Sequence, residues 1–264
     1  MRKGTLALCL VAAGMLAAQA AAQSGFNGTW RYNADKTRPT QDPVKLDFRD
    51  GVYRCASCDP VFAVVADGAD HPDSTDPAFD TARARLSSDG ALRVARMKAG
   101  KVAREITITP SADGQVLTVH HTNYMESSSE PARITTRMRR HGKAPEGLPA
   151  INGEWLIERW DPGSENVTTF TMHVTDDRAR VHSPTGEGYE AKFDGREYPV
   201  DGSNGLGRVR VRLLSPTVLE ETSLRAGKVD GVARLELSPD GRSLTITISE
   251  PGSRTPTVAI YEKQ

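Results

Sequence analysis

The sequence contains two copies of one long pattern, and this internal repeat constrains the fold more than any other feature. The stretch from Phe62 to His120 matches the stretch from Tyr189 to Thr247 at a constant offset of 127 residues, without a gap. The copies share the blocks Asp-Gly-x-x-[His/Tyr]-Pro, Ala-Gly-Lys-Val and Ser-x-Asp-Gly. Because solenoid units run only about 20–50 residues, a repeat of this length predicts whole domains.

A Pro- and Gly-rich stretch, residues 141–150, separates the copies. It holds two Pro and two Gly in ten positions, a composition typical of linkers. A second match opens each copy, Phe26-Asn-Gly-Thr-Trp30 against Ile151-Asn-Gly-Glu-Trp155. The sequence therefore predicts a first domain over 24–140, a linker over 141–150 and a second domain over 151–264.

The first 22 residues have the features of a secretory signal peptide. Arg2 and Lys3 precede an apolar run from Leu6 to Leu16, and small-residue cleavage sites end at Ala20 and Ala22. The run is shorter than the roughly 20 apolar residues that cross a bilayer, and no later stretch is apolar enough to do so. We therefore expect a periplasmic or secreted protein without a membrane span.

Both halves of the mature chain carry little net charge. The balance is +2 over residues 24–142 and −4 over residues 143–264. Nucleic-acid binding needs a strong positive field, so we expect no nucleic-acid partner. These features leave the oligomeric state open.

Within each copy, apolar residues alternate with polar ones at a period of two. Clear runs are Glu105–Ile108, Leu117–Val119, Leu235–Leu237 and Leu244–Ile248. Such alternation places one face of a strand in a core and the other in water. Asp-Gly pairs between the runs are typical of tight hairpin turns.

These signals predict eight or nine strands in the first copy, near residues 28–33, 44–49, 52–57, 61–66, 81–87, 91–98, 102–109, 115–122 and 133–140. Short connections favour an antiparallel meander, and closure into a barrel removes the exposed sheet edges. The predicted fold is all-β, with two tandem antiparallel eight- to nine-stranded meander barrels. Two-sheet β-sandwiches are the alternative.

The opening strands carry a known signature. Gly28-Thr-Trp30 and Gly153-Glu-Trp155 resemble the Gly-x-Trp motif of lipocalins. Together with the shared blocks, they are similar to a family of exported bacterial lipocalin-like proteins of unknown function. The resemblance implies a barrel and ligand carriage, with no catalytic residues to transfer. It also implies that Trp30 and Trp155 close the barrel floors beneath basic residues near the last strands, for which Arg137, Arg139 and Lys263 are candidates.

Cys55-Ala-Ser-Cys58 is the one motif in the sequence whose residue types suggest a specific chemistry. It lacks the βαβ surroundings of a thioredoxin-like dithiol, and a zinc site would need ligands from distant histidines. A local disulfide in an oxidising compartment is the preferred interpretation, with metal binding and redox catalysis as alternatives. The sequence assigns no metal and no cofactor.

His121 is the main candidate for contact with a ligand. It continues the inward parity of Leu117 and Val119, so it is expected to point into the first barrel. An imidazole there would line a ligand site, or would simply be hydrogen-bonded near the barrel mouth.

No nucleophile elbow, zinc-protease motif or phosphate-binding loop is present in the sequence. We therefore lean against an enzyme and expect an exported protein that binds a small apolar or amphipathic ligand, a small molecule or a lipid, in the cell envelope. The alternative is a structural or protein-interaction module whose barrels are filled by their own side chains. A hydrolase or isomerase is the least favoured class.

Overall fold

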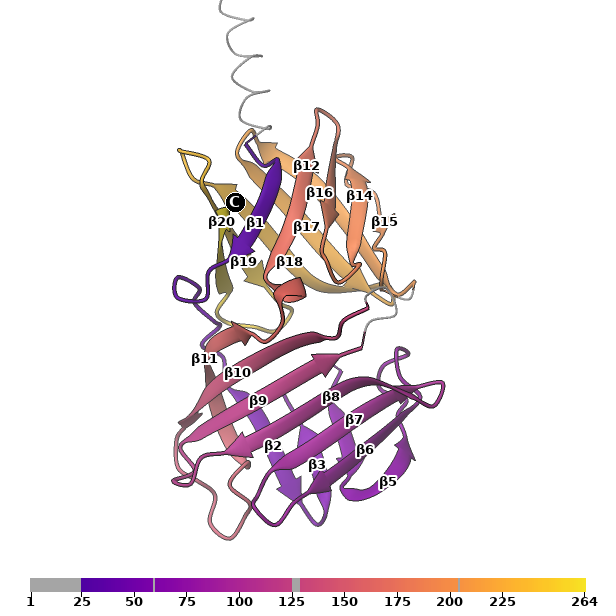
Figure 1. Ribbon diagram of the computed structural model, residues 1–264, viewed down its shortest axis with the longest axis vertical. Helices are drawn as coiled ribbons and strands as arrows, with labels where there is room; N and C mark the ends of the chain where they lie inside the picture. Colours follow the sequence, from indigo (N-terminus) through magenta and orange to yellow (C-terminus); the bar gives the residue numbers. More distant parts are fainter. Residues whose placement is uncertain (1–24, 59, 125–128, 204) are drawn as a thin grey trace, which may run out of the picture.

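The computed structural model describes residues 25–58, 60–124, 129–203 and 205–264, so the predicted signal peptide lies outside the described residues. The described chain forms two ten-stranded antiparallel sheets, each curled into a nearly closed barrel (Figure 1). Apart from the strands, one short 3-10 helix, η1 (Glu165–Val167), is present in this part of the chain. The predicted all-β class and the two tandem barrels are confirmed, with ten strands per barrel rather than eight or nine.

The first barrel is built from consecutive strands. These are β2 (Val44–Arg49), β3 (Val52–Cys55), β4 (Phe62–Val65), β5 (Asp67–Pro72), β6 (Thr81–Leu86), β7 (Leu92–Lys98), β8 (Lys101–Pro110), β9 (Val116–Asn123), β10 (Ala132–His141) and β11 (Gly153–Pro162). Each strand pairs with its neighbour in sequence, except that β4 and β5 form the two edges and β2 pairs with β11. The meander expected from the short connections is therefore present.

The second barrel takes one strand from the start of the chain and the rest from its end. Its strands are β1 (Gly28–Tyr32), β12 (Thr169–Val174), β13 (Arg178–His182), β14 (Gly188–Lys192), β15 (Tyr198–Pro199), β16 (Gly207–Ser215), β17 (Val218–Arg225), β18 (Lys228–Leu237), β19 (Ser243–Ser249) and β20 (Thr257–Lys263). β1 lies between β12 and β20. The first barrel is thus inserted between two neighbouring strands of the second.

The sheets therefore do not follow the boundary between the sequence repeats. β1 opens the first copy but lies in the second barrel, whereas β11 opens the second copy but pairs with β10 and β2 in the first. The predicted linker, 141–150, is the connection of the β10–β11 hairpin. Both copies open with the same Gly-x-Trp strand, so the pattern alone does not tell which barrel each strand closes.

One strand was missed because its first residues read as a turn. Asp67-Gly68 predicted a hairpin turn, but these residues begin β5, which pairs with β6 with a shift in register between Asp67 and Asp70. Gly68 has φ = 86°, a conformation that glycine adopts freely at bulges. Gly68 therefore has the positive φ that the Asp-Gly pair predicted, but the residue lies in a bulge of the edge strand β5 and not in a hairpin turn.

The two barrels are stacked along the longest axis of the molecule (Figure 1). Each has a closed end, here called the floor, where Trp30 or Trp155 is completely buried. The floors lie at opposite ends of the molecule, and the other ends, here called the mouths, face each other. Residues 33–43 and 163–168 cross between the barrels at this junction.

Candidate functional site

The floors are built in the same way in both barrels. The indole Nε1 of Trp30 donates to the backbone oxygen of Phe26 at 2.8 Å, and that of Trp155 donates to the backbone oxygen of Ile151 at 3.0 Å. In each case the acceptor lies four residues before the tryptophan, so the opening motif folds back under its own ring. This satisfies the one polar atom of a side chain that is otherwise fully apolar and buried.

A cation covers each floor tryptophan. Lys263 Nζ lies 5.2 Å from the centroid of the Trp30 ring, and Arg140 Cζ lies 4.1 Å from that of Trp155. These distances suit cation–π contacts. Lys263 therefore lies over the Trp30 ring at the floor of the second barrel.

The glycine of each Gly-x-Trp motif makes room for that cation. A Cβ atom on Gly153 would lie 2.8 Å from Arg140 Nη1, and one on Gly28 would lie 3.0 Å from Lys263 Cε. Both glycines also have positive φ, +122° and +136° respectively. The long basic side chain passes over the Cα atom of the glycine before it reaches the tryptophan ring. This contact explains why the motif has glycine two positions before tryptophan.

Arg137 and Arg139 lie on the outer surface rather than at the floor. Both pair with Glu158, at 3.3 Å and 3.2 Å, and more than half of each arginine side chain is exposed. Along β10 the inward positions are even-numbered, which turns Met138 and Arg140 inward. Alternation from Met138 would have identified Arg140 as the cation of this floor.

Toward its mouth the lumen of the first barrel becomes polar. The strand register defines two successive layers of inward side chains: Val94, Ile106, His121 and Ile134, and then, at the rim, Arg96, Arg104, Asn123 and Ala132. Apart from the floor cation Arg140, the charged side chains that point into the first lumen thus lie at the end that faces the second barrel.

His121 points into this lumen, and its imidazole makes no hydrogen bond with any residue that the structure describes. Burial lowers the pKa of His121 from 6.5 to about 4, with smaller contributions from the charges of Arg104 and His120. His120 has the opposite parity and lies 3.0 Å from the hydroxyl of Thr135 on the outer face. At neutral pH the lumen therefore contains an uncharged imidazole with free hydrogen-bonding capacity.

The depressed pKa of His121 predicts a loss of stability in acid. The folded state prefers the neutral imidazole of His121. The free energy of unfolding is therefore undiminished by this residue above about pH 6.5, and it decreases as the pH falls toward 4. Discounted for partial exposure, the loss should be about 1–3 kcal/mol. We expect His121→Ile to flatten this part of the thermal-stability profile relative to the native protein. The exposed His120→Gln is the control, and a profile unchanged by His121→Ile would contradict the assignment.

Arg96 is held at the rim by an acidic loop. Its Nε donates to Asp73 Oδ2 at 2.6 Å and its Nη2 to Thr75 Oγ1 at 2.9 Å, and Arg96 and Asp73 are both buried. The guanidinium also covers the ring of Phe79, 3.9 Å from its centroid. The loop from β5 to β6 is therefore anchored across the mouth of the first barrel.

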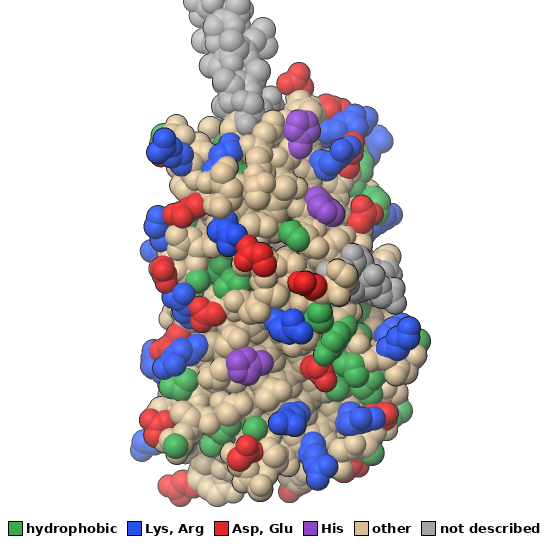
Figure 2. Space-filling view, viewed as in Figure 1, with side chains coloured by type: hydrophobic (Ala, Val, Ile, Leu, Met, Phe, Trp, Pro, Cys, Tyr) green, Lys and Arg blue, Asp and Glu red, His purple; other side chains and the backbone are tan. Residues whose placement is uncertain are grey.

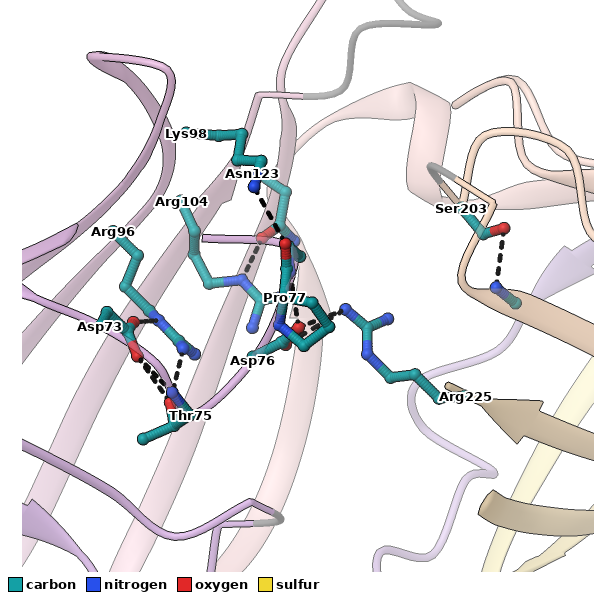
Figure 3. Close-up of polar contacts among 12 residues, drawn as sticks. Asp73, Thr75, Asp76, Pro77, Arg96, Lys98, Arg104, Asn123, Ser203 and Arg225 are labelled. Carbon is teal, nitrogen blue, oxygen red and sulfur yellow. Dashed lines mark hydrogen bonds and ion pairs between the residues drawn. The ribbon is translucent and has the colours of Figure 1, made fainter. Parts of the chain in front are cut away.

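The same loop connects the two barrels. Asp76 accepts hydrogen bonds from Arg225 Nη2 on both carboxylate oxygens, each at 3.1 Å. Arg225 ends β17 of the second barrel, so this ion pair bridges the two mouths (Figure 3). The Arg225 contact and a backbone hydrogen bond from Ala78 favour the ionised carboxylate, and the pKa of Asp76 is lowered despite its burial.

The lumen of the second barrel has a different polar group at the matching depth. Glu221 lies in one layer with Val211, Ala233 and Ile248, and it accepts a hydrogen bond from the hydroxyl of Tyr189. Burial raises the pKa values of both Glu221 and Tyr189. The first lumen is thus basic near its mouth, whereas the second is acidic and phenolic.

Side chains fill the floor halves of both lumens more completely than the mouth halves. Leu92, Leu117, Leu219 and Leu244 are all 0% exposed. Closer to the mouths, inward side chains keep part of their surface exposed, as at Ile106, His121, Ile134, Glu221, Ala233 and Ile248. Val94 and Val211 of the same layers are buried, so the partly exposed inward side chains lie in the mouth halves beside fully packed ones.

A separate cleft of about 720 Å³ lies on the outside of the junction. It is lined by residues of the 37–41 crossover, by Leu156, Ile157 and Glu158 of β11, and by Pro256 and Val258. The cleft is distinct from the lumens.

The charges on the surface of the molecule form no patch of one sign on the face drawn in Figure 2, where basic and acidic side chains are intermingled.

Cys55 and Cys58 form a disulfide, with their Cα atoms 5.4 Å apart, which confirms the preferred interpretation of this motif. Cys55 is buried at the end of β3, and Cys58 lies on the exposed loop that follows. The bond closes a local loop at the edge of the first barrel.

The fold and the floors define a protein with two stacked antiparallel barrels, in which the chain of the first barrel is inserted between β1 and β12 of the second. No family model matches the sequence, and no curated protein matches it. Within the described residues, no helix has the length and hydropathy that crossing a bilayer requires.

Proposed function

We propose that this is an exported, lipocalin-like protein of the cell envelope that binds a small amphipathic ligand and catalyses no reaction. The supporting observation is the contrast between the fully buried side chains at the floors and the inward side chains of the mouth halves, several of which are partly exposed. Ligand sites in proteins are mostly apolar with a few converging polar groups, and the mouth halves have this composition. The signal-like N-terminus and the Cys55–Cys58 disulfide support export to an oxidising compartment.

The competing function is that of an interaction module. The outer cleft favours it, because apolar side chains such as Leu156 and Val258 lie there beside the polar 37–41 crossover. A partner chain would then bind the outside of the junction, and the lumens would be filled by their own side chains. The two functions differ in which residues matter, and that difference can be measured.

The test is native mass spectrometry of the protein purified from its own envelope, with variants that fill one space at a time. Ile106→Trp places an indole in the mouth half of the first lumen, and Thr107→Trp places one on the outer face as the control. We expect a co-purifying small molecule on the native protein and on Thr107→Trp, and a strongly reduced bound fraction on Ile106→Trp. Retention by Ile106→Trp, or no bound molecule on any form, would count against the proposal.

A further inference from the structure

Three arginines meet at the junction of the barrels, and two of them have a carboxylate partner. Arg96 pairs with Asp73, and Arg225 pairs with Asp76. Arg104 donates only from Nε, to the side-chain amide oxygen of Asn123 at 2.7 Å (Figure 3). Its other N–H groups have no hydrogen-bond or ion-pair partner among the residues that the structure describes.

The position of Arg104 makes its unpaired N–H groups unfavourable for stability. The guanidinium lies at the rim of the lumen, directly across from Arg96 in the strand register and 5.5 Å from the centroid of the Phe79 ring. Burial and the neighbouring positive charges of Arg96 and Arg225 lower the pKa of Arg104. A desolvated charge is stabilised only when its hydrogen-bonding groups are paired.

The acidic side chains near Arg104 do not pair with its guanidinium among the residues that the structure describes. Asp76 and Glu187 both act electrostatically on Arg104, but no ion pair joins either to it within the described residues. Asp76 is bound to Arg225. Glu187, on the loop before β14, keeps part of its surface exposed, and burial at the junction raises its pKa although the charges of Arg225 and Arg104 act to lower it. A bound anion would contact Arg104 from the lumen side, where His121 occupies the next layer.

The barrel fold itself does not require this polar set. At the positions of Arg96, Arg104 and His121, the second copy has Ser223, Gly231 and Ile248. The pair Ser223–Gly231 occupies the same register position as Arg96–Arg104, so the comparison holds in three dimensions. Floor positions are instead shared, as with Leu92 and Leu219 or Leu117 and Leu244. The first barrel thus differs from the second by the cationic groups at its mouth.

We propose that the first barrel binds the oxyanion of an amphipathic ligand, a carboxylate or a phosphate, through Arg104 with His121 as a hydrogen-bonding neighbour. The apolar chain of the ligand lies against Ile106 and Ile134, one layer deeper than Arg104. Guanidinium groups bind carboxylates and phosphates with paired, charge-assisted hydrogen bonds. This inference rests on the proposed function and specifies its ligand class and the barrel that recognises it.

Isothermal titration of the full chain without its signal peptide tests the site, with decanoate, decyl phosphate, decanol and inorganic phosphate as probes. We expect the preferred anionic probe to bind at least about tenfold more tightly than decanol, because charge-assisted hydrogen bonds exceed neutral ones. Arg104→Met should weaken anion binding at least about tenfold and leave decanol binding unchanged, since Met keeps the apolar stem. Arg93→Met, on the exposed face of the adjacent strand, is the matched control.

Each result has a distinct meaning. Decanoate and decyl phosphate separate a carboxylate site from a phosphate site, and either preference supports the proposal. Equal binding of decanol and both anions, unchanged by Arg104→Met, would overturn the anion site while supporting the proposed lumen. Binding of inorganic phosphate as tight as that of decyl phosphate would overturn the amphipathic ligand. No binding of any probe would overturn both proposals, and near-UV circular dichroism shows whether Arg104→Met is folded.

Discussion

A polypeptide of residues 43–163 should fold by itself into the first barrel, whereas residues 43–150 should not. The longer fragment contains all ten strands of that sheet, including β11 with Trp155. The shorter one lacks β11, which leaves β2 and β10 as unpaired edges and removes the floor. Losing a buried tryptophan alone costs about 3–5 kcal/mol, out of a total stability of about 5–15 kcal/mol for a typical domain.

The measurement is near-UV circular dichroism and amide dispersion in NMR spectra of the two fragments. We expect dispersed signals and a cooperative thermal transition for 43–163 only. Deletion of the first barrel gives the complementary check, because Arg31 in β1 is paired with Thr169 in β12 of the second barrel. Replacing residues 34–167 by a short turn should therefore leave a folded second barrel. A well-folded 43–150 fragment together with an unfolded 43–163 fragment would show that the strand assignment is wrong.

Much of the fold follows from the sequence because alternation is a local property. The period of two in Leu117–Val119 and Leu244–Ile248 correctly places these side chains inside the barrels. The exchange of the opening strands is not local. Either Gly-x-Trp strand has the residues to close either floor, and the choice depends on the lengths and paths of the 33–43 and 163–168 crossovers.

The candidate site was only partly predictable. The parity of His121 could be read from β9, and the structure places it in the lumen. Arg96 and Arg104 follow the same alternation on β7 and β8, but they become notable only when Arg225 and the loop carrying Asp73 are seen beside them. Those contacts join segments far apart in the chain, so no pattern in a single strand contains them.

Replacing the floor cation of the first barrel should have a large effect on stability. Arg140 is buried, and it donates to the backbone oxygens of Gly114, Ala150 and Asn152 at 2.7, 2.6 and 2.8 Å. Arg140→Met would leave these acceptors unpaired and remove the contact with the Trp155 ring. Each buried unsatisfied acceptor costs about 1–3 kcal/mol. The oxygen of Asn152 is buried, whereas those of Gly114 and Ala150 are partly solvated and should cost less. With the lost cation–π contact, we expect the free energy of unfolding to fall by about 3–5 kcal/mol.

The neighbouring Arg139 is a close control, since it differs from Arg140 by one position and points outward to Glu158. Arg139→Met should cost less than about 1 kcal/mol, as expected for an exposed ion pair. Lys263→Met should fall between the two, because Lys263 donates to a single backbone oxygen, that of Gly25, at 2.7 Å. Urea unfolding followed by hydrogen exchange locates each loss: Arg140→Met should expose the first barrel and Lys263→Met the second. Equal and small losses for Arg140 and Arg139 would mean that the cation does not hold the floor together.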